Sequence, residues 1–291
     1  MISKSARIIE RLFSLIGTRS AVSKLICNPK RNNRYAEPPK SFFRKFIVQC
    51  DTICGRKCFS LKTSASPEKH IFYFHGGAYT LQAQRMHWRI IGILLAKTRC
   101  EITNVNYPLA PECTCDDTLP MVIEAYSKLG KSSARKTILM GDSAGGGLAL
   151  ALAQQIKAQG LLLKPEKIIL LSPWLDISMD KNLTKEQEER DLVLTKDTLL
   201  TVGKSYAGNY DARDFRCSPL YGEITNIGDI ALFTGTSEIL NVQARQLRDE
   251  LTRQGQNMSY FEYEQMQHVW IGLPIPEAKK ALEQVISFIE K

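Results

Sequence analysis

The chain has 291 residues, of which 44% are hydrophobic and 24% charged, and its formal charge is +9 at pH 7. A chain of this length buries a sizeable core without metals or disulfides, as one large α/β domain or two small ones. No apolar run reaches the roughly 18 residues that a membrane span needs, and charged residues interrupt the N-terminus, so we expect neither a membrane span nor a secretory signal.

The positive charge is concentrated in residues 1–69, which hold 15 Lys and Arg against 4 Asp and Glu, whereas residues 70–291 hold 24 against 26. A basic arm is able to bind nucleic acid or an anionic membrane surface. No nucleic-acid-binding motif accompanies this charge, so we expect no nucleic-acid partner. Contact with a membrane surface stays open as an alternative to simple solvation of the arm, and the sequence leaves the oligomeric state open.

The eight cysteines are expected to be reduced thiols in a cytoplasmic protein, because no export signal is recognised. Cys50, Cys54 and Cys58 recur at intervals of four. They form no C-x-x-C pair and have no histidine nearby, so we expect no metal site and no cofactor.

The N-terminal part of the chain predicts an amphipathic helix over residues 4–26, followed by a polar and basic loop. The apolar face of this helix carries Ile8, Ile9, Leu12, Phe13, Leu15 and Ile16. Residues 1–41 are therefore interpreted as a separate N-terminal unit that covers part of the following domain, residues 42–291. Residues 42–50 and 57–62 alternate in polarity and predict two antiparallel strands.

From residue 70 onward, the chain alternates between buried strands and helices. The strands are predicted at 70–74, 101–106, 137–140, 167–171, 230–233 and 259–263, and the helices at 84–96, 119–129, 144–159, 238–252 and 277–289. Such alternation predicts a three-layer α/β/α sandwich with a mostly parallel sheet. An insertion at about 178–216 interrupts the pattern and predicts a lid. Ligands are expected at the carboxyl ends of the strands.

The most informative stretch is residues 138–151, ILMGDSAGGGLALA. An apolar strand breaks at Gly141-Asp142-Ser143-Ala144-Gly145 and continues as a helix of small residues. This is the strand–turn–helix setting of a G-x-S-x-G nucleophile elbow, which holds a serine hydroxyl in a strained turn. Ser143 is therefore the candidate nucleophile.

A serine nucleophile needs a base, and the chain has only four histidines. His268 is the candidate, because it lies in a loop after the last predicted strand, at the expected edge and free to reach Ser143, whereas His75 belongs to a glycine turn. An acid should orient this histidine, and the order serine, acid, histidine favours Glu238 after the strand at 230–233. Asp176, which follows the preceding strand, is the second candidate.

The developing oxyanion needs N–H donors aimed at one point. The turn His75-Gly76-Gly77-Ala78 follows a strand and offers unobstructed amides. We therefore expect the N–H groups of Gly76, Gly77 and Ala144 to bind the oxyanion. The substrate pocket is expected to be lined by His75, Ala78, Tyr79, Asp142, Trp174 and Val269.

Taken together, these motifs resemble the hormone-sensitive-lipase-like branch of the α/β-hydrolases. The resemblance covers roughly residues 70–291 and includes His75 to Ala78, Tyr107 to Glu112, Gly141 to Gly146, Ser172 to Trp174 and Ser218 to Tyr221. It implies a triad of Ser143, Glu238 and His268, and a lid built partly from the N-terminal residues. In two places the chain departs from the family pattern. The glycine turn reads Gly-Gly-Ala, and Glu238 stands where the family usually has aspartate.

Because bacterial members of this family are carboxylesterases, the sequence predicts a serine carboxylesterase acting on small acyl esters. An amide or formamide hydrolase, or an acyltransferase, would use the same triad. A membrane-surface lipase docked by the basic arm is a further alternative. A binding module that has lost catalysis would lack a triad member, and none is missing here.

Overall fold

Eight strands form one sheet in the computed structural model, which describes residues 2–31, 35–63, 66–131, 135–180 and 183–291. Their order across the sheet is β1-β2-β4-β3-β5-β6-β7-β8. In chain order they are β1 (Ile47–Ile53), β2 (Arg56–Lys62), β3 (Lys69–Phe74), β4 (Cys100–Val105), β5 (Lys136–Asp142), β6 (Lys167–Leu171), β7 (Asp229–Gly235) and β8 (Met258–Tyr263).

The direction of the strands sets the position of the site. β2 runs antiparallel to β1 and β4, and every other pairing in the sheet is parallel. The strands from β3 to β8 therefore end at the same edge, where loops from several strands meet. The predicted mostly parallel sheet is confirmed.

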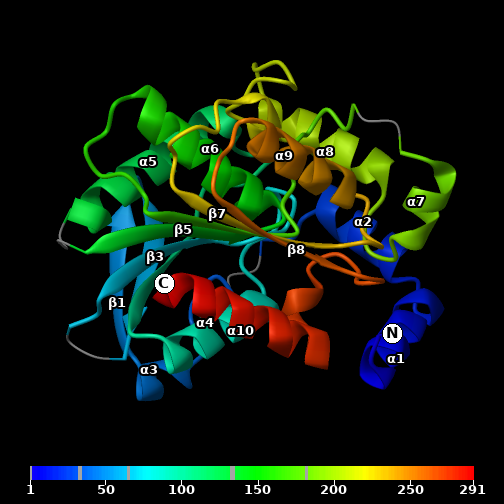
Figure 1. The fold of residues 1–291 in the computed structure, drawn as a ribbon, viewed down its shortest axis with the longest axis horizontal. Coiled ribbons are helices and arrows are strands. Elements are labelled where there is room, and N and C mark those ends of the chain that lie inside the picture. Colours follow the sequence, from blue (N-terminus) through cyan, green and yellow to red (C-terminus); the bar gives the residue numbers. More distant parts are fainter. Residues whose placement is uncertain (1, 32–34, 64–65, 132–134, 181–182) are drawn as a thin grey trace.

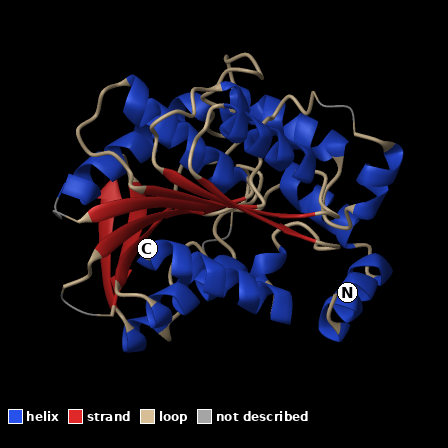
Figure 2. Cartoon of the chain, viewed as in Figure 1, coloured by secondary structure: helices blue, strands red, loops and turns tan. Residues whose placement is uncertain are grey.

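Helices cover both faces of the sheet, which completes the predicted three-layer sandwich (Figures 1 and 2). One layer contains α4 (Arg85–Lys97) and α10 (Pro276–Glu290), which bury Trp88, Leu94 and Val285 against it. The opposite layer contains α5 (Cys115–Lys131), α6 (Ala144–Ala158), α8 (Lys196–Ala207) and α9 (Asn241–Arg253). The two layers share no core, because the sheet separates their hydrophobic clusters.

The predicted N-terminal helix is two helices, α1 (Lys4–Leu15) and α2 (Thr18–Cys27). The break falls at Gly17, whose φ of 64° is a left-handed conformation that glycine adopts without steric cost. α2 packs against α8, and Arg19 donates to the carbonyl of Leu194 at 3.1 Å and pairs with Glu188 at 3.3 Å. The N-terminal unit thus contacts the insertion. That the two together act as a lid stays a prediction.

The insertion between β6 and β7 contains α7 (Lys185–Arg190), α8 and the short 3₁₀ helix η1 (Pro219–Tyr221). A second 3₁₀ helix, η2 (Trp270–Gly272), follows β8. The carboxyl edge of the sheet is therefore bordered by the insertion and by the segment after β8.

Three predicted element boundaries are wrong. The strand expected over 42–50 is the short helix α3 (Phe42–Lys45) followed by β1, because Phe42 packs edge-to-face on Trp88 at 6.0 Å. α5 begins at Cys115, four residues before the predicted start, so Pro120 lies inside the helix. α9 begins at Asn241, which leaves Glu238 in the turn that precedes the helix.

Candidate active site

Ser143 lies at a sharp turn between β5 and α6, with φ 53° and ψ −123°. The neighbouring glycines permit this turn. A Cβ on Gly145 would lie 2.0 Å from the carbonyl oxygen of Phe74, and one on Gly141 would lie 2.2 Å from that of Gly145. Such a strained backbone persists only where its surroundings hold it, and it is concentrated at functional sites. Ser143 is buried, with 7% of its surface exposed.

A continuous chain of hydrogen bonds links Ser143 to His268 and Glu238. Nε2 of His268 lies 2.8 Å from Oγ of Ser143. On the other side of the ring, Nδ1 lies 2.7 Å from Oε2 of Glu238. The three side chains come from loops after β5, β8 and β7, whose carboxyl ends share one edge of the sheet. The fold therefore brings together the three residues that the sequence singled out.

Glu238 is a buried carboxylate held in a fixed orientation. Its Oε1 accepts hydrogen bonds from Oγ1 of Thr234 and from the N–H of Gly235, both at 2.7 Å, which leaves Oε2 for His268. Because Glu238 precedes α9, it does not occupy the first turn of that helix, where the macrodipole would explain a glutamate. The turn lets the longer side chain fold back toward the end of β7.

The electrostatic surroundings of His268 favour its protonated form. Burial acts to lower the pKa of His268, but the hydrogen bond and the charge of Glu238 raise it, and the charges of Asp191 and Asp142 add to this, so the pKa lies above its ordinary value. A histidine that accepts a proton from a serine needs such stabilisation of the imidazolium.

The glycine turn after β3 differs from prediction in one donor. The N–H of Gly76 donates to Oδ1 of Asp142 at 3.1 Å, so Gly76 is not free to bind an oxyanion. Within the described part of the chain, the N–H groups of Gly77, Ala78 and Ala144 have no hydrogen-bond acceptor. The available donors beside Ser143 are therefore Gly77, Ala78 and Ala144, and the expectation for Gly76 is corrected.

Asp142 supports the site from behind rather than lining a substrate pocket. Besides Gly76, it accepts from the hydroxyl of Tyr73 at 2.6 Å and pairs with Nε2 of His87 at 3.2 Å. Burial acts to raise the pKa of Asp142, but His87 and the Tyr73 hydrogen bond outweigh it, so the pKa lies below its usual value. The buried carboxylate ties the oxyanion turn to the nucleophile turn.

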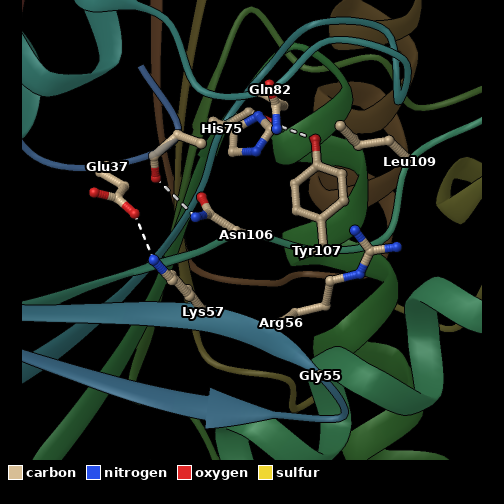
Figure 3. Close-up of a pocket in the computed structure, with 10 residues that line it drawn as sticks. Glu37, Gly55, Arg56, Lys57, His75, Gln82, Asn106, Tyr107 and Leu109 are labelled. Atoms are coloured by element: carbon tan, nitrogen blue, oxygen red, sulfur yellow. Dashed lines mark hydrogen bonds and ion pairs between the residues drawn. The ribbon is translucent and has the colours of Figure 1, made fainter. Parts of the chain in front are cut away.

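His75 also lies away from the predicted place. Its Nδ1 donates to the carbonyl of Gly76 at 2.8 Å, and its ring stacks on Tyr107 at 4.5 Å. Burial and the neighbouring His87 lower the pKa of His75 to about 4. His75 lines a pocket of about 240 Å³, and no residue of the Ser143–His268–Glu238 chain lines that pocket. Figure 3 shows His75 there with Gln82, Tyr107, Gly55 and the first two residues of β2, Arg56 and Lys57.

The other predicted pocket residues, Ala78, Tyr79, Trp174 and Val269, are buried at this edge and stay predictions. Tyr79 stacks face to face on Tyr206 of α8 with ring centroids 3.6 Å apart, so the insertion contributes to this region. Trp174 donates its backbone N–H to the carbonyl of Ser143 at 2.9 Å. Bulky aromatic side chains therefore surround the start of α6.

Asp176, the second candidate for the acid, has a different set of partners. Its Oδ1 accepts from the N–H and the hydroxyl of Ser178, and its Oδ2 accepts from the hydroxyl of Tyr221 at 3.1 Å. Among the described residues, no hydrogen bond joins Asp176 to His268. These contacts are typical of a carboxylate that caps a turn.

The insertion holds the acid loop through Asp191, a residue that sequence reasoning missed. Asp191 is fully buried. Its Oδ1 accepts from the N–H groups of Val193 and Leu194 at 2.8 Å each, and its Oδ2 accepts from the N–H of Ile239 at 2.9 Å. Ile239 directly follows Glu238, so Asp191 fixes the backbone beside the acid. In the sequence Asp191 ends a charged run and looks like part of a solvated surface.

The insertion holds the base loop through Gln267, which directly precedes His268. The side-chain oxygen of Gln267 accepts from the N–H of Leu192 at 2.8 Å, and its nitrogen donates to the carbonyl of Arg190 at 3.1 Å. The same nitrogen donates to Oε1 of Glu10 in α1 at 3.3 Å. Residues 190–192 thus contact the loops of both Glu238 and His268.

The residues that the structure describes contain no group of three or more His, Cys, Asp or Glu arranged to hold a metal ion. None of the helices in the same part of the chain is both long and apolar enough to cross a bilayer.

Comparisons with known proteins agree with this geometry. The model of the α/β-hydrolase fold family matches residues 71–272. An esterase from Acinetobacter venetianus is 28% identical over 245 residues, which cover 81% of this chain and 79% of that protein. An acetyl-hydrolase from Streptomyces hygroscopicus is 28% identical over 224 residues, with coverages of 75% and 74%.

Solved structures share the fold over nearly the whole chain. A hormone-sensitive lipase from a metagenome library has a TM-score of 0.83 at 22% identity and covers 98% of this chain and 97% of its own. EstE7, a homologue of hormone-sensitive lipase from a metagenome library, has a TM-score of 0.84 at 22% identity, with coverages of 100% and 99%. At this identity the likeness shows the fold alone.

The fold and the strained serine turn define a hydrolase of the three-layer α/β type. The chain belongs to the α/β-hydrolase fold family, whose model matches more than half of it. The predicted resemblance to hormone-sensitive-lipase-like enzymes is confirmed, and so is the predicted class of carboxylic ester hydrolase.

The contacts of Asp191 lead to a first prediction. In Asp191→Asn, the amide keeps the volume but loses the charge and one acceptor oxygen, so the backbone after Glu238 loosens. We expect kcat for a soluble ester to fall about ten-fold, which corresponds to losing ~1.5 kcal/mol from a hydrogen bond to a charged group. Steady-state kinetics with circular dichroism as a check on folding measure this.

Asp197→Asn is the matched control, because Asp197 is an exposed aspartate of the same insertion. It should keep the kinetics of the unmodified protein. Equal kcat for Asp191→Asn and Asp197→Asn would contradict a positioning role for Asp191.

Proposed function

We propose that this chain is a serine carboxylesterase that hydrolyses small acyl esters through Ser143, His268 and Glu238. The observation that carries the proposal is the hydrogen-bond chain from Oγ of Ser143 through both ring nitrogens of His268 to Glu238, at 2.8 and 2.7 Å. Three amide donors without an acceptor in the described part of the chain lie in the two turns beside it. This set of groups is what acyl transfer to serine requires.

In the acylation step, Oγ of Ser143 attacks the ester carbonyl as Nε2 of His268 takes its proton. Glu238 holds the ring and stabilises the imidazolium that forms. The N–H groups of Gly77, Ala78 and Ala144 bind the oxyanion of the tetrahedral intermediate. His268 then returns the proton to the leaving alcohol, and the acyl group stays on Ser143.

In the deacylation step, a water molecule replaces the alcohol. His268 takes a proton from this water as the oxygen attacks the acyl carbon, and the same amides bind the second oxyanion. Collapse of the intermediate breaks the bond to Oγ, which recovers its proton from His268. The carboxylic acid leaves, and Ser143 is ready for another cycle.

A preference for small acyl groups is supported by the aromatic side chains near the nucleophile. Tyr79, Trp174 and Tyr206 are buried, and the hydroxyl of Tyr79 and the carbonyl of Trp174 lie next to Gly147 in the first turn of α6. They leave little room for a long chain in this direction. The similarity to an acetyl-hydrolase from Streptomyces hygroscopicus agrees with this preference.

Amide or formamide hydrolysis and acyl transfer to an alcohol would use the same residues. A panel of 4-nitrophenyl esters of increasing chain length, with the matching anilides and with added alcohols as acceptors, separates these activities. The proposal expects the highest kcat/KM for short esters. Faster turnover of anilides, or products dominated by transesterification in water, would contradict it.

The nucleophile is tested by Ser143→Ala. Turnover of a short ester should fall by on the order of 10⁶, as in other serine hydrolases that lose their nucleophile, while the circular dichroism spectrum stays unchanged. A fluorophosphonate probe should label the unmodified protein but not the variant. Labelling of the variant at another serine would refute the assignment.

The acid is tested by comparing Glu238→Gln with Asp176→Asn. Glu238→Gln should lower kcat by about 10²–10⁴, since the carboxylate that orients the imidazole in a serine protease triad contributes up to the larger factor. Asp176→Asn should cost far less, because Asp176 contacts Ser178 and Tyr221 instead of His268. The opposite order of the two effects would mean that the acid is misassigned.

The pH profile gives an independent test of the same pair. Only neutral His268 accepts a proton, so kcat/KM should rise with pH through a pKa above the ordinary value for histidine. In Glu238→Gln the stabilising charge is lost while burial remains. The pKa of His268 therefore falls, and the acidic limb of the residual activity should move to lower pH. An unmoved limb would show that Glu238 does not act on His268.

A further inference from the structure

α1 carries apolar residues on two sides, of which the fold uses only one. On the inner side, Ala6 and Ile9 join the hydrophobic cluster that contains Trp270 and Ile275. On the outer side, Ile8, Leu12, Leu15 and the following Ile16 are exposed by 58%, 49%, 83% and 70%. The inner residues explain why α1 packs against the rest of the chain. They do not explain why its outer side is apolar.

The outer side is unusual within this molecule. In the described part of the chain, the large apolar side chains exposed beyond the N-terminal helices are Phe43, Ile47, Leu162, Leu200 and Tyr221, which are distributed over separate elements. Single exposed apolar residues are normal on protein surfaces. Four bulky ones within nine residues form a continuous apolar stripe.

The exposed charges on α1 itself are all positive. Lys4, Arg7 and Arg11 are exposed on the same helix. The one acidic residue among residues 1–31, Glu10, faces inward, where Gln267 donates to its carboxylate at 3.3 Å. An apolar stripe flanked by cations, with its only carboxylate turned away, complements the headgroups and acyl boundary of an anionic lipid surface.

We propose that the outer face of α1, formed by Ile8, Leu12, Leu15 and Ile16 with Lys4, Arg7 and Arg11, docks onto an anionic phospholipid bilayer. A second copy of the chain fits this face less well. A two-fold symmetric contact with the two copies of α1 antiparallel would place their three cations on the same side of the contact, where they repel. In a bilayer, by contrast, phosphate headgroups neutralise those cations, and the boundary between headgroups and acyl chains accepts the apolar stripe.

Docking at this face also positions the catalytic edge. The inner side of α1 contacts Gln267, which directly precedes His268. In Figure 1, α1 lies beyond the end of β8, on the side of the insertion helix α7. A bilayer bound to the outer face is therefore separated from the base loop by α1. Docking here would bring esters dissolved in the membrane close to Ser143. This role rests on the proposed function, whereas the docking itself does not.

The docking is tested by co-sedimentation of the full chain with vesicles of phosphatidylcholine alone or with added phosphatidylglycerol. Binding should require phosphatidylglycerol and should fall as salt is raised. The double variants Leu12→Ser/Leu15→Ser and Arg7→Gln/Arg11→Gln should each bind about ten-fold more weakly. Leu162→Ser is the matched control, because Leu162 is 96% exposed and far from α1 in sequence, and it should bind like the unmodified protein.

Three results would overturn the docking proposal. The first is that phosphatidylglycerol vesicles do not retain the unmodified chain, and the second is that Leu12→Ser/Leu15→Ser binds as tightly as Leu162→Ser. In the third, sedimentation velocity shows a dimer that the Leu12→Ser/Leu15→Ser variant abolishes, without vesicle binding.

Hydrolysis of a soluble short ester, measured on all variants, keeps the two proposals separate. Unchanged turnover with lost vesicle binding supports a docking face outside the catalytic machinery. Vesicle binding by a chain that hydrolyses no ester would support docking and refute the proposed function.

Discussion

The backbone of Ser143, at φ 53° and ψ −123°, is the constraint on which the site depends. It places the serine side chain at the end of β5 and lets α6 start at the next residue. The turn exists because Gly141 and Gly145 have no Cβ, since a Cβ on either residue would lie only 2.2 or 2.0 Å from a backbone carbonyl oxygen, far inside van der Waals contact. Asp142 within the same turn binds the N–H of Gly76 at 3.1 Å and so fixes the glycine turn beside it. One strained residue therefore sets the relation between the nucleophile and the amide donors.

The other half of the site depends on segments far from it in the sequence. Asp191 and Gln267 connect residues 190–194 of the insertion to the loops that carry Glu238 and His268. Glu10 of α1 adds a third contact at Gln267. The covering elements thus do more than shield the site, because they hold the backbone on either side of the acid and the base. A movement of the insertion would therefore displace both loops.

The sequence predicted the parts of this structure that depend on local pattern. The strands from β3 to β8 were recognisable as buried apolar runs, and the order of the loops pointed to Ser143, Glu238 and His268. What it could not reveal depends on distant contacts. The amide of Gly76 is taken by a carboxylate 66 positions away, and Asp191 is buried although its neighbours are charged. The left-handed Gly17 and the packing of Phe42 on Trp88 changed two element boundaries for the same reason.

The central claim is that Ser143, activated by His268, forms a covalent acyl intermediate. It is tested most directly by quenching the reaction with 4-nitrophenyl acetate at its steady state and mapping the protein by peptide mass spectrometry. We expect an acetyl group on the peptide that contains Ser143. In a control reaction with acetate in place of 4-nitrophenyl acetate, the same peptide should carry no acetyl group. An unmodified Ser143 peptide during active turnover, or an acetyl group confined to another residue, would contradict it.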